Sequence, residues 1–110
     1  MKKPLACLAL LAAAGSSLAA TSPPPCAADA IAQAGKLLAW HNGSGEQVAV
    51  EPQAKALAPI ANPVNKAQKF SVLEVAGHIY KANYRMRLIY AAAGGQCLLM
   101  GQEILELSNP

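Results

Sequence analysis

The feature that most constrains the fold is a regular alternation of side chains over residues 80–90. The even positions are apolar or aromatic: Tyr80, Ala82, Tyr84, Met86, Leu88 and Tyr90. The odd positions are polar or basic, with Ile89 as the exception: Lys81, Asn83, Arg85 and Arg87. A period of two residues is typical of a β-strand with one face buried and the other in water. We therefore expect a sheet whose apolar face is covered by another element.

The flanking segments predict further strands of the same sheet. Residues 70–76 form one expected strand and residues 97–107 another, with a turn at Gly94 and Gly95 and a bulge near Gly101. Residues 46–50 are a short strand candidate. Residues 51–66 contain Pro52, Pro59 and Pro63, which predict an irregular connection with one helical turn around residues 54–58.

The element expected to cover the sheet is a helix over residues 26–41. Its apolar side chains recur at spacings of three and four residues, Asp29 lies in its first turn, and Asn42 and Gly43 form a stop signal. The expected fold class is α+β: an N-terminal helix packed on a three- to four-stranded antiparallel sheet, with the other face in water.

The first residues have the form of a secretory signal peptide. Lys2 and Lys3 precede an uncharged apolar run, and small side chains at Ser17 and Ala19 favour cleavage after Ala19, with Ala20 as the alternative site. An uncleaved N-terminal membrane anchor is the competing interpretation. The predicted organisation is a signal peptide over residues 1–19, a proline-rich spacer over residues 20–25 and one domain over residues 26–110. The expected location is periplasmic or secreted, without a membrane span in the mature chain.

Cleavage at this point would leave two cysteines, Cys26 and Cys97. An even pair in an oxidising compartment predicts a disulfide, and two unpaired buried thiols are the alternative. Closing a loop of this length would stabilise so small a domain by about 4 kcal/mol. Loss of the two lysines would also lower the formal net charge from +3 to +1, which argues against a nucleic-acid partner.

The sequence contains no recognisable catalytic or metal-binding pattern. The two histidines, His41 and His78, have no cysteine or carboxylate near them at a metal-ligand spacing, and no Gly-x-Ser-x-Gly turn is present. We therefore expect a protein that is not an enzyme and carries no cofactor or metal.

Two surfaces are candidates for binding. Lys81, Arg85 and Arg87 form a basic stripe, which is either a solvated face paired with Glu103 or Glu106, or a contact for an acidic partner. The tyrosines of the opposite face either pack beneath the helix or line an apolar cavity for a small ligand or lipid.

A family resemblance is carried by residues 73–80, which read Leu-Glu-Val-Ala-Gly-His-Ile-Tyr. This segment resembles the first hairpin of the cystatins, inhibitors of cysteine peptidases, whose motif is Gln-x-Val-x-Gly, often followed by a tyrosine. Val75, Gly77 and Tyr80 match this motif, and Leu73 stands in place of the glutamine. The resemblance implies that Val75, Ala76, Gly77 and His78 form a loop that wedges into a peptidase cleft.

Cystatins also use a glycine near an N-terminal trunk and a Pro-Trp pair in a second hairpin. Here residues 23–25 are prolines, and Trp40 lies in the expected helix. The resulting prediction is an exported, non-enzymatic binding module that contacts a protein partner in the envelope or outside the cell, in the form of a cystatin-like peptidase inhibitor. The alternatives are a periplasmic carrier of a small ligand or lipid, and an envelope interaction protein.

Overall fold

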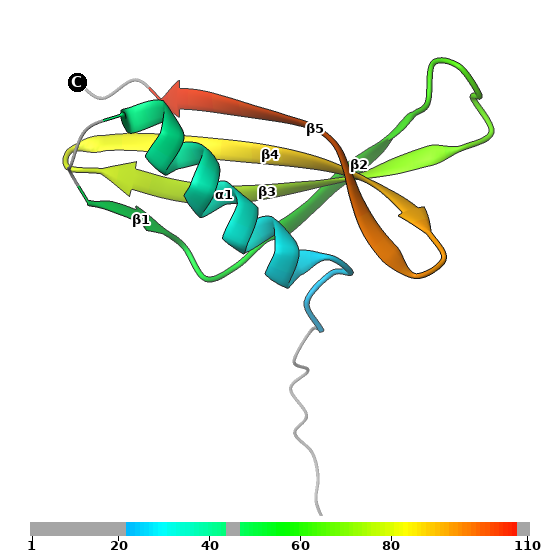
Figure 1. Ribbon diagram of the computed structural model, residues 1–110, viewed down its shortest axis with the longest axis horizontal. Helices are drawn as coiled ribbons and strands as arrows, with labels where there is room; N and C mark the ends of the chain where they lie inside the picture. The colour runs from blue at the N-terminus through cyan, green and yellow to red at the C-terminus, as the bar shows by residue number, and fades with distance from the viewer. Residues whose placement is uncertain (1–21, 44–46, 108–110) are drawn as a thin grey trace, which may run out of the picture.

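The computed structural model describes residues 22–43 and 47–107, so the predicted signal peptide lies outside the described residues. One helix packs on one face of an antiparallel sheet, which confirms the α+β class (Figure 1). The sheet has five strands where the sequence predicted three or four. The elements are α1 (Ala27–Asn42), β1 (Val48–Val50), β2 (Lys55–Ala61), β3 (Lys69–Ile79), β4 (Ala82–Ala93) and β5 (Gln96–Leu107).

The additional strand is β2, and the irregular connection with a helical turn at residues 54–58 is therefore a wrong prediction. The strand order is β1-β3-β4-β5, and β1 and β2 pair with successive parts of the same side of β3. β2 contains Pro59, which an edge strand accommodates because one side of its backbone needs no partner. The register shifts between Leu57 and Ile60, on either side of this proline.

β3 continues three residues beyond its predicted end. It reaches Ile79, so residues 75–78 lie inside the strand and the predicted loop there is wrong. The chain turns instead at Tyr80 and Lys81, where Tyr80 has a φ of 54°. Tyr80 is 80% exposed and does not pack beneath the helix. The remaining aromatic positions of the alternation, Tyr84 and Tyr90, are buried as predicted.

β5 contains the expected bulge. Ile89 pairs with Gly101 while Tyr90 pairs with Leu99, which leaves Met100 as an extra residue on β5. β5 bends sharply along its length, as expected for a bulged strand (Figure 1). The turn before β5 is also confirmed, since Gly94 and Gly95 both have positive φ values.

The main core lies between α1 and the sheet. Ala30 and Ala34 are fully buried and let the helix backbone approach the sheet closely. Leu38 packs into the same cluster as four β-strand side chains: Leu73, Val75, Met86 and Leu88. At the edge of this core the Tyr90 hydroxyl donates a hydrogen bond of 2.6 Å to the Asp29 carboxylate in the first turn of α1.

The predicted disulfide is present between Cys26, just before α1, and Cys97, at the start of β5. It ties the helix to the strand farthest from β1 and is consistent with an oxidising, exported location. None of the helices in the described part of the chain has the length and apolar character needed to cross a membrane.

Candidate functional site

Three separate chain segments lie toward one end of the sheet. Ser71, near the start of β3, pairs with Tyr90, near the end of β4, so the β2–β3 loop and the β4–β5 turn lie at the same end. The disulfide holds residues 22–26 there as well, because Cys97 pairs with Ala92 beside the β4–β5 turn. We call this the disulfide end; the Tyr80–Lys81 turn lies at the opposite end (Figure 1).

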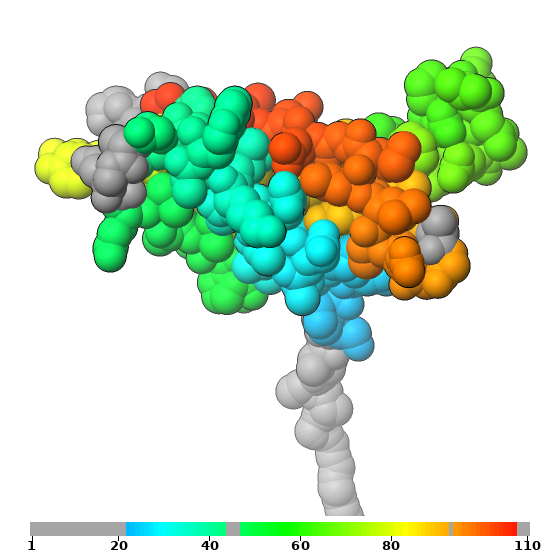
Figure 2. All heavy atoms as spheres, in the orientation of Figure 1, coloured from blue at the N-terminus to red at the C-terminus, as the bar shows by residue number. Residues whose placement is uncertain are grey.

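The β2–β3 loop, residues 62–68, is held in shape by its own hydrogen bonds. The Asn62 side chain donates to the Gln68 side chain at 2.8 Å and accepts from the Val64 backbone N–H at 2.9 Å. The backbone N–H of Asn62 also donates to the Gln68 carbonyl at 2.9 Å. This preformed loop presents Val64, 92% exposed, and projects away from the body of the molecule (Figure 2).

Other large apolar side chains are exposed on the strands that lead to this end. The exposed apolar side chain on β2 is Ile60. The exposed apolar side chains on β5 surround the bulge: Leu98, Leu99 and Met100. Met100 is 55% exposed because the bulge turns it out of the ladder. Exposed apolar side chains gathered near projecting loops are typical of surfaces that bind other proteins.

The proline-rich segment borders two hollows beside the first half and the middle of β3. One of about 560 Å³ lies between this segment, α1 and the link before β2, lined by residues that include Pro23, Pro24, Ile31, Ala54 and Lys55. A smaller one of about 150 Å³ separates the prolines from β2 and β3. Each is open to solvent and of a size to receive a side chain of a partner.

The space between α1 and the sheet offers no comparable room. It is filled by side chains with at most 1% of their surface exposed: Leu38, Leu73, Val75, Met86 and Leu88. The tyrosines expected to line an apolar cavity, Tyr84 and Tyr90, are part of this packed core.

The four residues predicted to form a contact loop divide between the two faces of β3. Val75 and Gly77 face α1 and are buried, whereas Ala76 and His78 are half-buried on the open face of the sheet. A methyl group at Gly77 would lie 2.8 Å from the Leu38 side chain. Gly77 therefore allows close packing of the helix and is buried beneath it.

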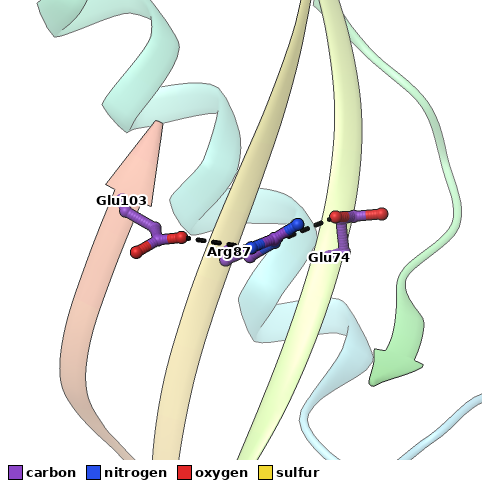
Figure 3. Close-up of polar contacts among 3 residues, drawn as sticks. All are labelled: Glu74, Arg87 and Glu103. Atoms are coloured by element: carbon purple, nitrogen blue, oxygen red, sulfur yellow. Dashed lines mark hydrogen bonds and ion pairs between the residues drawn. The ribbon is translucent and has the colours of Figure 1, made fainter. Parts of the chain in front are cut away.

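The basic stripe is also divided. Arg87 lies between two carboxylates, with its Nε donating to Glu74 at 3.1 Å and its Nη1 to Glu103 at 3.5 Å (Figure 3). The pairing of Arg87 with Glu103 confirms the predicted cross-strand contact, and register places Glu74 opposite the same arginine. Glu74 has only 12% of its side chain exposed, so Arg87 neutralises a carboxylate that is largely out of water.

The other two basic residues have different surroundings. Arg85 is exposed on β4 and makes no ion pair within residues 22–43 and 47–107. Lys81 belongs to the turn, with its ammonium 5.6 Å from the centre of the Tyr80 ring. The three residues therefore do not form one continuous stripe.

A polar cluster that the sequence did not predict surrounds His78. Its Nδ1 lies 2.7 Å from Asn83 Oδ1 and its Nε2 lies 3.0 Å from Glu51 Oε2. Both partners are oxygen acceptors, so the arrangement is satisfied when the imidazole carries a proton on each nitrogen. The hydrogen bond to Glu51 is the main cause that raises the pKa of His78 above 6.5, followed by the one to Asn83. Glu51 could not be placed from the sequence because the connection that carries it was expected to be irregular.

Among the described residues no group of three or more histidine, cysteine or acidic side chains is arranged to hold a metal ion.

Comparison with known proteins gives no further indication of what this site binds. No protein-family model, curated protein or solved structure gives a significant match to the chain.

Proposed function

We propose that the protein is an exported, non-enzymatic binding module that recognises a protein partner through its disulfide end. The observation that carries this proposal is that residues 22–26, the loop 62–68 and the β4–β5 turn all lie toward one end of the sheet. Segments that project from a rigid scaffold form protein-binding surfaces at a low cost in conformational entropy. The disulfide and the internal hydrogen bonds of the loop fix the surface before a partner arrives.

The finer form of the proposal is inhibition of a papain-like cysteine peptidase in the periplasm or outside the cell. Cystatins use a trunk near the N-terminus and two hairpins for this purpose, and residues 22–26, loop 62–68 and the β4–β5 turn would serve as the corresponding segments here. Binding would block the cleft by shape and backbone contacts, without any covalent step. Val64 at the tip of loop 62–68, and not the buried Gly77, would then enter the cleft.

The experiment uses the oxidised mature protein as an inhibitor in a peptidase assay with papain. Val64→Asp is expected to weaken inhibition on the order of tenfold, because it places a charge on an apolar contact. Tyr80→Asp is the matched control, since Tyr80 is also a highly exposed apolar side chain, at 80%, but lies at the opposite end of the sheet. Absence of inhibition by the wild-type protein would refute the peptidase-inhibitor form.

The broader proposal has its own test in affinity capture from an envelope extract. A specific partner bound by the wild-type protein and by Tyr80→Asp, but lost with Val64→Asp, would support recognition through the disulfide end. A partner retained by Val64→Asp and lost with Tyr80→Asp would place the contact at the opposite end and overturn the proposal.

A further inference from the structure

The outer side of β5 is an open sheet edge. β5 is twelve residues long and pairs with β4 on one side, and no segment within residues 22–43 or 47–107 pairs with its other side. Figure 1 shows its second half as the upper rim of the sheet. An exposed edge offers unpaired backbone N–H and C=O groups to any other strand, and proteins usually block it with prolines, lysines, bulges or short strands.

Two protective features are present in β5, the bulge and the charged side chains of Glu103 and Glu106. The bulge at Met100 interrupts the edge, but the straight run that follows, residues 101–107, contains neither proline nor lysine. This run is Gly-Gln-Glu-Ile-Leu-Glu-Leu, and it is already extended as a strand by its pairing with β4. It therefore remains available to an added strand.

Side chains on both faces of the sheet flank this edge. On the helix side, Trp40 is 78% exposed and borders a hollow of about 330 Å³ together with Lys36 and Gln102. On the open face Leu105 is 39% exposed. A strand added to β5 would cover the apolar surface of Trp40 and Leu105, two large side chains that are otherwise left in water.

We propose that a second copy of the protein occupies this edge, with the two β5 strands antiparallel about a two-fold axis at Ile104. In this register Ile104 meets Ile104 of the second copy, Glu103 meets Leu105, and Gln102 meets Glu106. Centring the pair on Glu103 would oppose two like charges, and centring it on Leu105 would leave only residues 103–107 paired. Ile104 is thus the centre that uses the whole run without a direct clash of charges.

Charge complementarity supports the same register. Lys36 lies beside Gln102 in the hollow next to β5. Because Gln102 faces Glu106 of the second copy, each Lys36 is brought close to a carboxylate of the other molecule. Because the proposed dimer has two-fold symmetry, the contact between Lys36 and Glu106 of the second copy occurs twice. The interface uses residues 101–107 and α1, so it goes beyond the proposed function and does not depend on it.

The first test is sedimentation of the oxidised mature protein from about 1 to about 300 µM, a range that covers weak and moderate dimers. We expect a concentration-dependent monomer–dimer equilibrium. Lys36→Glu and Glu106→Lys should each raise the dissociation constant on the order of tenfold, and the double variant should restore it. Lys66→Glu makes the same charge change in loop 62–68 and should have no effect. A protein that stays monomeric over the whole range would overturn the proposal.

A cysteine scan tests the register directly. Residues directly opposite in antiparallel strands have Cα atoms about 4.5–5.5 Å apart, within the range for a disulfide, whereas diagonal neighbours lie beyond it. Mild oxidation should therefore link Ile104→Cys into a covalent dimer but not Leu105→Cys. Peptide mapping checks that the native Cys26–Cys97 bond is intact. Linking through position 105 and not 104 would refute the proposed register.

Discussion

Replacement of Gly77 by alanine tests whether residues 75–78, the segment that resembles a cystatin loop, serve to pack the core or to bind a partner. An added Cβ would lie 2.8 Å from Leu38 Cδ2, 2.9 Å from Met86 Cε and 3.0 Å from the carbonyl oxygen of Ala49. Leu38 and Met86 are fully buried, so neither side chain has solvent to move into. The Ala49 carbonyl belongs to β1, whose residues 48–50 pair with residues 77–79 of β3, so relief there would displace β1.

The expected cost follows from two opposing effects. Overpacking a filled core costs about 1–3 kcal/mol, and three contacts at or below 3.0 Å place Gly77→Ala near the upper limit. Alanine recovers about 0.5–1 kcal/mol because it restricts the unfolded chain more than glycine does. The net loss should be about 2 kcal/mol, or roughly 8–16 °C in Tm for a domain of this size.

The assay is urea unfolding of the oxidised mature protein, followed by circular dichroism. Gly35→Ala is the matched control, because nothing lies within 4 Å of the added methyl group and the helix should gain up to about 1 kcal/mol. Unchanged stability of Gly77→Ala together with loss of partner binding would refute the packing argument. It would also restore residues 75–78 as a contact segment.

Three further perturbations test the remaining contacts. Replacing both disulfide cysteines by serine should cost about 4 kcal/mol in urea unfolding, given that the bond joins residues 71 positions apart; a loss below about 1 kcal/mol would contradict the loop-closure argument. Tyr90→Phe removes a hydrogen bond to the Asp29 carboxylate, which is exposed and can take up water instead, so we expect a loss of about 1–1.5 kcal/mol in the same assay. Folding raises the pKa of His78, so its contribution to stability is complete below pH 6.5 and disappears as the pH rises through the folded-state pKa. His78→Gln should therefore be less stable than wild type by up to about 1 kcal/mol near pH 5 and equal to it near pH 9; an equal loss at both values would show that the proton is not involved.

The elements that the sequence predicted best are those whose pattern comes from burial on one face. The alternation at Tyr84, Met86, Leu88 and Tyr90 corresponds to side chains beneath α1 with at most 7% exposure. The helix followed from apolar spacing in the same way, and the disulfide followed from the cysteine count. In each case one dominant effect, burial or covalent pairing, produces a pattern that can be read in the sequence: an apolar period or an even number of cysteines.

The wrong or missing predictions concern segments that carry no such sequence pattern. Tyr80 continues the apolar alternation, yet it turns the chain with a positive φ at a position where glycine is usual in two-residue hairpins. β2 has no buried face to give it a period, and its proline indicated a break. Glu51 lies between β1 and β2, and it contacts His78 because both strands pair with β3. This contact therefore depends on the pairing of strands that are distant in the sequence.

The arrangement of the sheet lets the two proposed surfaces operate together. The bulge at Met100 divides β5 into a first half that belongs to the disulfide end and a straight half that would pair with a second copy under the proposal above. Because the two β5 strands would run in opposite directions, their disulfide ends would point away from each other across the joined sheet. Each end would then remain free to contact its own partner, and dimerisation would present two binding surfaces without covering either of them.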